Sequence, residues 1–265
     1  MTIEKVKEYV ESLYIGELAI SSPFEIDIEA IAFYKNALVV ERPLTGCEAM
    51  IIGAGNNAII TVKADSNNER KRFSIGHELG HWIKDRGTIG NLCSQSDMDE
   101  TKSHQQGRET IANAFASELL IPSYLLTKYI NDSPLNLDLL SGVKEAFQIS
   151  FMASLRRVIG SQQHLGFFAI YRSDGSRRLF HANKKIPYSF LPPDTVPNGS
   201  KIFDLIFNGH DKGAGFINGS VWCKDDWADE SEVFEHSFHY HNDDFISIVW
   251  WKDEEPVWRC LDSKN

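Results

Sequence analysis

The first sixty residues alternate between the hydrophobic spacing of helices and that of strands. Apolar residues recur at helical spacing over residues 3–13, and Asp27 is a good N-cap for a second short helix over residues 27–36. Residues 37–43 have the composition of a strand. Residues 49–62 hold two apolar runs around Gly-Ala-Gly-Asn-Asn, which predicts a hairpin.

Helices dominate the rest of the first half. The stretch Ser66-Asn67-Asn68-Glu69 matches a capping box, so a helix should start there, and Gly87 and Gly90 should end it. A polar loop follows this helix. Three further helices are predicted beyond the loop, the first of them stopped by Pro122, over residues 106–120, 135–147 and 151–159.

The pattern changes to short strands after Gly160. Residues 164–183 predict two strands around the turn Ser173-Asp174-Gly175. Four later stretches alternate or cluster apolar and aromatic residues as strands do: GSVWCKDDW, EVFEHSFHYH, DFISIVWW and PVWRCLD. We therefore expect an α+β chain of two domains. Residues 1–160 would form a helical domain with a small β-sheet, and residues 163–265 a smaller, β-rich α+β domain.

Composition narrows the class of protein. The chain has 265 residues, 42% of them hydrophobic, which is enough for one large core or two small ones. No stretch approaches 18 apolar residues and the first residues mix acids with bases, so we expect no membrane span, no signal peptide and a cytoplasmic location. The four cysteines are widely spaced without a CxxC pair, which disfavours a zinc ribbon or a redox centre.

The chain is acidic in both halves. The formal net charge is −10, with 16 Lys and Arg against 21 Asp and Glu in residues 1–160, and 11 against 16 in the rest. Because neither half offers a basic surface for phosphates, we expect no direct contact with nucleic acid. An acidic protein can still attract a basic protein partner.

One stretch carries recognisable chemistry. Residues 77–81 are His-Glu-Leu-Gly-His, and residues four apart share one face of a helix, so His77 and His81 can point at one metal ion. Glu78 lies about 100° further round. It can take a proton from a metal-bound water and pass it to the leaving amine of a peptide. Zinc suits such a site, and a pair of buried core histidines is the alternative.

A catalytic zinc usually has three protein ligands and an open fourth position. The metzincin class is excluded, because Lys84 and Gly87 stand where its extended motif requires Gly and His. A carboxylate on a second helix is the remaining common solution. Residues 108–122 offer two, Glu109 and Glu118.

Glu109 is the favoured third ligand. Asn113 lies four residues further on, where it can hydrogen-bond to Glu109 and orient it from the second shell. The small residues Ala112 and Ala116 would let this helix pack close to the zinc helix. Glu118 is expected to be exposed or held in a salt bridge.

The stretches FSIGHELGHWIKD and ETIANAFASELLIP together resemble the ImmA/IrrE family of metallopeptidases, also known as DUF955. The family pattern is HExxH, a gap, and E-x-x-A-N-x-F-A-x-x-L-L-x-P, and the likeness covers about residues 25–155. The resemblance implies a zincin-like domain with Zn2+ on His77, His81 and Glu109 and with Glu78 as general base. It also implies a cytoplasmic bacterial or phage protein that relieves transcription by cleaving a helix-turn-helix repressor.

The C-terminal half departs from part of that family. Its radiation-response members carry a DNA-binding-like helical segment and a GAF-like domain after the peptidase. Here residues 163–265 have the pattern of an aromatic-rich β module. A role in DNA damage therefore does not carry over to this chain.

Other residues allow both a functional and a structural interpretation. Cys93 could cap the open zinc position as a redox switch, or be a half-buried residue under a loop. His104 and Tyr124 could steady the oxyanion beside zinc, or only pack. His239 and His241 share a strand face that could suit a second metal, but no neighbouring ligand completes a set and a solvated face is favoured.

The aromatic C-terminal region also has two interpretations. Five of the six tryptophans lie in the last 44 residues, among acidic clusters. They form either an aromatic core with charged loops or a recognition surface for a protein partner. Residues 57–62 could be an edge strand that pairs with an extended substrate. Gly213-Ala-Gly215 lacks the companions of a phosphate loop, so nucleotide binding has no support.

These patterns favour a zinc-dependent endopeptidase that carries out selective, regulatory proteolysis of a regulator such as a DNA-binding repressor. The alternative is a non-proteolytic protein, in which zinc stabilises a binding or sensor module, or a toxin-antitoxin or phage-associated interaction protein. Glu78 favours the peptidase, because a structural zinc prefers four protein ligands and needs no base beside them.

Overall fold

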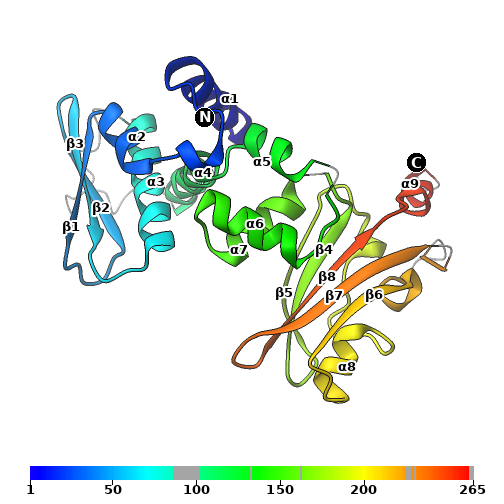
Figure 1. Cartoon of the computed structure of the whole chain (residues 1–265). Helices are drawn as coiled ribbons and strands as arrows, with labels where there is room; N and C mark the ends of the chain where they lie inside the picture. The colour runs from blue at the N-terminus through cyan, green and yellow to red at the C-terminus, as the bar shows by residue number, and fades with distance from the viewer. Residues whose placement is uncertain (86–101, 132, 162, 225–227, 230, 263–265) are drawn as a thin grey trace. The chain divides into compact units, whose positions relative to one another are not determined.

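The computed structural model describes residues 1–85, 102–131, 133–161, 163–224, 228–229 and 231–262. It has helices and two β-sheets, with a helical region around a small sheet followed by a β-rich region (Figure 1), which confirms the α+β class. Two compact units divide the chain: Met1–Tyr129 with Val143–Ser150, and Ile130–Gly142 with Phe151–Asn265. Among the described residues, none of the helices combines the length and the hydrophobicity that a membrane span requires.

The first half contains the expected helices and hairpin, with additions. A π-helix (Ser12–Glu17) follows α1, and a 3-10 turn (Pro23–Glu25) precedes α2. The elements in chain order are α1 (Ile3–Glu11), α2 (Ile28–Tyr34), β1 (Ala37–Arg42), β2 (Ala49–Ala54), β3 (Asn57–Lys63), α3 (Asn68–Asp85), α4 (Lys102–Leu120), α5 (Ser123–Ile130), α6 (Leu137–Phe147) and α7 (Phe151–Gly160). The expected end of the zinc helix at Gly87 and Gly90 lies outside the described residues.

The N-terminal sheet has the strand order β1-β3-β2. β1 pairs with β3 in parallel, and β2 pairs with β3 antiparallel through the predicted hairpin. Residues 57–62 therefore lie in the central strand, and their expected role as an edge strand for a substrate is wrong. Both hydrogen-bonding edges of β3 are already used, and the edges of the sheet belong to β1 and β2.

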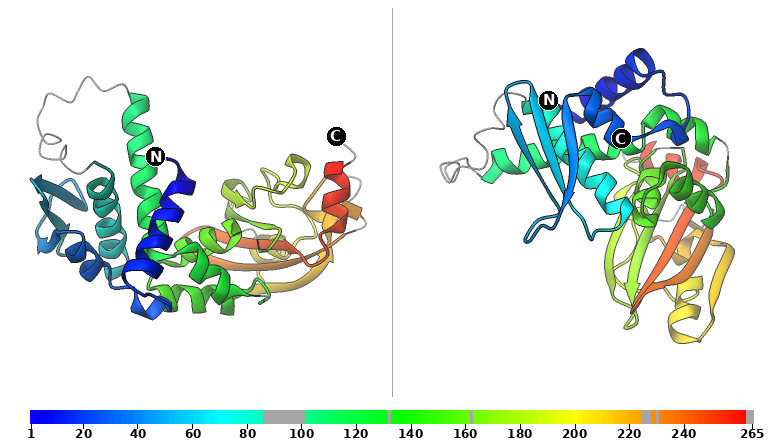
Figure 2. Two further views of the ribbon diagram at one scale, coloured as in Figure 1. Left: turned by 90° about the horizontal axis from the view of Figure 1, so that it is seen from above. Right: turned by 60° about the vertical axis from the view of Figure 1, so that its left-hand side comes forward.

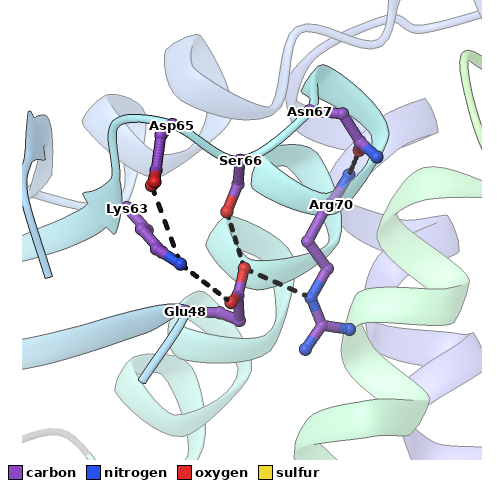
Figure 3. Close-up of polar contacts among 6 residues, drawn as sticks. All are labelled: Glu48, Lys63, Asp65, Ser66, Asn67 and Arg70. Atoms are coloured by element: carbon purple, nitrogen blue, oxygen red, sulfur yellow. Dashed lines mark hydrogen bonds and ion pairs between the residues drawn. The ribbon is translucent and has the colours of Figure 1, made fainter. Parts of the chain in front are cut away.

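Helix α3 is fixed at its start by a polar cluster (Figure 3). The Asn67 side chain accepts a hydrogen bond from the Arg70 backbone N–H at 2.8 Å, so Asn67 is the N-cap. Ser66, the cap expected from the capping box, instead donates its hydroxyl to Glu48 at 2.6 Å. The helix start is confirmed and its cap is corrected, because Glu48, just before β2, accepts the Ser66 hydroxyl instead.

Helix α5 is not among the predicted helices, and a contact of Glu118 explains where it starts. Glu118 is buried, and its carboxylate accepts from the Ser123 backbone N–H at 2.6 Å and from the Ser123 hydroxyl at 3.1 Å. It thus satisfies a donor in the first turn of α5, where helices leave N–H groups unpaired. Glu118 was expected to be exposed or held in a salt bridge; exposure is wrong, because the side chain is buried.

The second unit is built on a five-stranded antiparallel sheet with the order β5-β4-β8-β7-β6. Its elements are β4 (Gly166–Arg172), β5 (Arg177–Ala182), α8 (Lys201–Phe207), β6 (Lys212–Asn218), β7 (Glu232–His241), β8 (Asp244–Trp251) and α9 (Glu255–Asp262). Two expected strands are wrong. GSVWCKDDW contains a 3-10 turn (Gly219–Val221), and PVWRCLD lies in α9, where the Asp253 carboxylate accepts from the Glu255 N–H.

The core of this sheet supports the structural interpretation of its aromatic residues. Trp222 and Trp251 are buried beside Phe167. Glu235 is also fully buried, and it accepts from the Trp222 indole N–H at 2.9 Å and from the Ile202 backbone N–H at 2.8 Å. A buried carboxylate with such donors holds α8 and the Trp222 turn on one face of the sheet.

Helix α7 belongs to the second compact unit. Its Phe151 ring lies 5.9 Å from the rings of both Phe238 and Tyr240 on β7, so the helix packs on the sheet. The compact units thus divide the chain before α7, whereas the sequence suggested a division at residues 160–163. The division between domains at residues 160–163 stays a prediction.

Candidate metal centre

Helices α3 and α4 approach closely because small residues face each other where they cross. A Cβ placed on Gly80 would lie 2.6 Å from the Phe115 Cβ and 3.3 Å from the Ala112 Cα, and one on Gly76 would lie 3.1 Å from the Ala116 Cα. No side chain fits at either glycine without moving α4. Figure 2 (left) shows α4 lying between α3 and α1.

This close approach brings three ligand-type side chains together. The Nε2 atoms of His77 and His81 are 3.2 Å apart. Carboxylate oxygens of Glu109 lie 3.2 Å from the His77 Nε2 and 3.4 Å from the His81 Nε2. Within the part of the chain that the structure describes, these residues are the one group of at least three His, Cys, Asp or Glu side chains that could hold a metal ion.

The distances fit a small tetrahedral ion. Ligand atoms about 2.0–2.1 Å from a tetrahedral zinc are about 3.3 Å from one another, close to the spacings between His77, His81 and Glu109. Two imidazoles and one carboxylate leave a fourth position for water or substrate. The side chains of His77 and His81 are 18% and 13% exposed and that of Glu109 is 49% exposed, so solvent reaches the site from the Glu109 side.

Asn113 hydrogen-bonds to a histidine of this group. Its amide oxygen lies 3.0 Å from the Nδ1 atom of His77. Sequence spacing placed Asn113 at the site but paired it with Glu109. The crossing of α3 and α4 instead places Asn113 beside the His77 ring, on the side opposite Nε2. With Nδ1–H donating to Asn113, the Nε2 lone pair of His77 is directed at the ligand group.

Glu78 occupies a different environment from Glu109. Burial, together with the negative charge of Glu109, raises its pKa to about 7. A carboxyl group with a pKa near neutrality can both accept and return a proton at cellular pH. This environment is what a general base next to a metal needs, and burial of a helix residue cannot be derived from the HExxH spacing.

Of the remaining candidate residues, the structure describes the side chain of Tyr124. The Tyr124 hydroxyl donates to the Ile20 carbonyl at 2.8 Å, and burial, with smaller contributions from Glu11 and Glu25, raises its pKa to about 12. This donor is thus engaged by the backbone. His104 falls in the first turn of α4, and its side chain lies outside the described part of the chain, as does all of Cys93.

The histidines of β7 show no second metal group among the described residues. A ring nitrogen of His239 lies 2.5 Å from the Asn242 carbonyl oxygen, and its ring packs against Phe245 at 5.1 Å. His241 is exposed near the bulge that ends the strand. These contacts agree with the favoured interpretation of a solvated strand face.

The fold and the site define a class: an α+β protein in which an HExxH helix and a second helix gather two histidines and a glutamate. Residues 36–158 match the family model described as the IrrE N-terminal-like domain of peptidase family M78. This stretch includes His77, Glu78, His81 and Glu109. The chain therefore contains an IrrE N-terminal-like domain of a metallopeptidase-like family, and the resemblance to the ImmA/IrrE family is confirmed.

Solved structures support the fold. A structure described as a Mycobacterium tuberculosis transcriptional regulator aligns with 97% of this chain and 78% of its own, with a TM-score of 0.61 and 12% sequence identity. At this identity the likeness shows the fold alone. No curated protein matches this chain in sequence.

Proposed function

We propose that this chain is a zinc-dependent endopeptidase whose zinc ligands are His77, His81 and Glu109 and whose general base is Glu78. The observation that carries the proposal is the convergence of the three candidate ligand side chains next to Glu78, a half-buried carboxyl group with a pKa near 7. Membership of residues 36–158 in a peptidase family supports the same reaction.

Individual residues of this chain have distinct roles in the proposed reaction. Asn113 holds the His77 ring in the orientation that directs Nε2 inward. Glu78 accepts a proton from the attacking water and returns it to the leaving amine. Bound zinc would acidify that water and polarise the scissile carbonyl. The exposed side of the site at Glu109 is where an extended peptide has access.

The substrate class completes the proposal. We assign the protein to selective, regulatory proteolysis of a protein regulator, such as a helix-turn-helix repressor, in the cytoplasm and without direct contact with nucleic acid. The family resemblance and the acidic charge of both halves support this assignment.

Two measurements test the proposal. Elemental analysis of the purified chain should find about one zinc per chain, and Glu109→Gln should lose most of it, whereas Glu145→Gln, an exposed control, should keep it. Co-expression with helix-turn-helix regulators encoded by neighbouring genes should produce a defined fragment, detected by mass spectrometry.

The Glu78→Gln variant separates the peptidase from the non-proteolytic alternative. It should retain zinc and lose cleavage. Zinc binding without cleavage of any tested regulator, and without any effect of Glu78→Gln, would favour a zinc-stabilised binding or sensor protein, or a toxin-antitoxin or phage-associated interaction protein. Cleavage that survives Glu78→Gln would contradict the assigned base.

A further inference from the structure

The N-terminal sheet has an apolar face that is open to solvent, here called the outer face. Leu38, Ile59 and Ile52 stand in register across β1, β3 and β2. They are 51%, 47% and 54% exposed. The next row on the same face consists of Val40, Thr61 and Met50. A contiguous exposed apolar surface of this kind marks a contact with another molecule.

The opposite face of the same sheet is covered by helices, whereas the outer face has no such cover among the described residues. There Ile51, Ile60 and Val62 are buried, and α2 and α3 lie on that side (Figure 1). β1 and β3 form a parallel pair, and sheets built entirely of parallel strands are usually covered on both faces. A second layer on the outer face would complete this arrangement.

The size of the outer face decides between two occupants. Three strands about 4.8 Å apart and six residues long cover about 15 Å by 20 Å, or about 300 Å². A stable dimer needs about 800 Å² from each partner, so a second copy of this chain is too poorly held here. One α-helix, with a diameter of about 10 Å, fits across the three strands.

Charge distinguishes the two ends of the face. Arg42 and Lys63 pair in the row beyond Val40 and Thr61. Lys63 is already engaged by Glu48 and Asp65 (Figure 3), at 3.9 Å and 3.7 Å. Arg42 is exposed, and no described carboxylate forms an ion pair with it. An acidic group, or the negative C-terminal end of a helix, would be attracted to this end.

We propose that the outer face binds an amphipathic helix of a protein partner, with the apolar side of that helix on Leu38, Ile59 and Ile52 and its acidic C-terminal end beside Arg42. The bound helix covers the sheet on the side opposite α3. This docking surface is separate from the metal ligands, so it does not depend on the proposed peptidase activity.

The probe is a stapled, fluorescein-labelled helix of about 14 residues, roughly 20 Å long, with leucines along one side and glutamates in its last turn. Fluorescence anisotropy against the whole chain should show saturable binding. Ile59→Asp and Leu38→Asp should each weaken it by about tenfold or more, the effect of losing one central apolar contact. Phe24→Asp, which changes an exposed aromatic residue outside the face, should leave it unchanged.

Further variants and probes test the proposal independently. Arg42→Glu should weaken the glutamate probe and strengthen a probe that ends in lysines. Thermal unfolding checks that each variant is folded, and Leu38→Asp replaces Ile59→Asp if the latter is not. Equal binding of a probe with its leucines scattered round the helix would overturn the proposal. So would a dimer, seen by sedimentation, that Ile59→Asp dissociates.

Discussion

The amide oxygen of Asn113 on α4 lies 3.0 Å from Nδ1 of His77 on α3, so the two helices that supply the candidate metal ligands are also joined through the His77 ring. The contact fixes the rotation of the His77 ring about its bond to Cβ. It also selects the tautomer with a free lone pair on Nε2, the atom that faces His81 and Glu109.

Asn113→Ala should therefore weaken zinc binding by about 10- to 100-fold, the usual effect of removing a group that orients a metal-bound histidine. Asn113→Asp should lose less, because its carboxylate can still accept from Nδ1–H. Competition against a chromophoric chelator measures the affinity, with exposed Lys128→Ala on α5 as the control. An unchanged affinity in Asn113→Ala would show that the contact does not position the ligand.

Gly80→Ala should destabilise the fold by about 1–3 kcal/mol, because its Cβ would overlap Phe115 and push the helices apart. The same displacement should lower zinc affinity. Gly107→Ala is the matched control: Gly107 lies in α4 with nothing within 4 Å of its would-be Cβ. That change should raise the free energy of unfolding by about 0.5–1 kcal/mol. Urea unfolding with and without zinc checks both variants, and equal effects would refute the packing argument.

Gln148→Gly should stabilise the protein by about 1 kcal/mol. Gln148 follows α6 with a φ of 52°, a left-handed conformation that costs energy for any residue with a Cβ. The hydrogen bonds from Ile149 N to Lys144 O and from Gln148 N to Glu145 O show the Schellman motif, in which glycine is favoured. Gln148→Ala retains the strain and should show no such gain in unfolding free energy.

The contribution of His181 to the free energy of unfolding should fall as the pH drops through about 6.5, the usual pKa of histidine. Burial lowers the pKa of His181, and the charges of Arg156 and Lys184 lower it further, against a hydrogen bond to the Arg156 backbone. The unfolded chain then takes up a proton more readily than the folded one, so acid favours unfolding. Urea unfolding at pH 7.5 and 5.5 should show a smaller loss in His181→Asn than in the wild type.

Glu235→Ala should lower the free energy of unfolding by about 3 kcal/mol, because it leaves buried donors from α8 and Trp222 without an acceptor. Glu232→Ala, at the exposed start of the same strand, should cost less than about 0.5 kcal/mol. Urea unfolding followed by tryptophan fluorescence compares them. Similar losses in the two variants would show that the burial of Glu235 is not what matters.

Local patterns determined much of this protein. The spacing of His77 and His81, the hairpin before α3 and the helical stretch of α4 depend on neighbours in sequence, so local patterns predict each of them. The strand predicted over 256–262 failed for the converse reason. A short run with apolar residues at both periods is ambiguous; it folds as α9, whose first N–H donates to Asp253.

Tertiary structure decided what depends on how elements cross. Sequence placed Asn113 near the ligands, but only the α3–α4 packing at Gly80 put it against His77. Strand order put residues 57–62 in the centre of the sheet. The sequence could not predict this, because the hydrophobic pattern of a strand does not specify which strands it pairs with. The chain thus determines which side chains a helix presents, while burial and crossing geometry, set by distant residues, decide what each one touches.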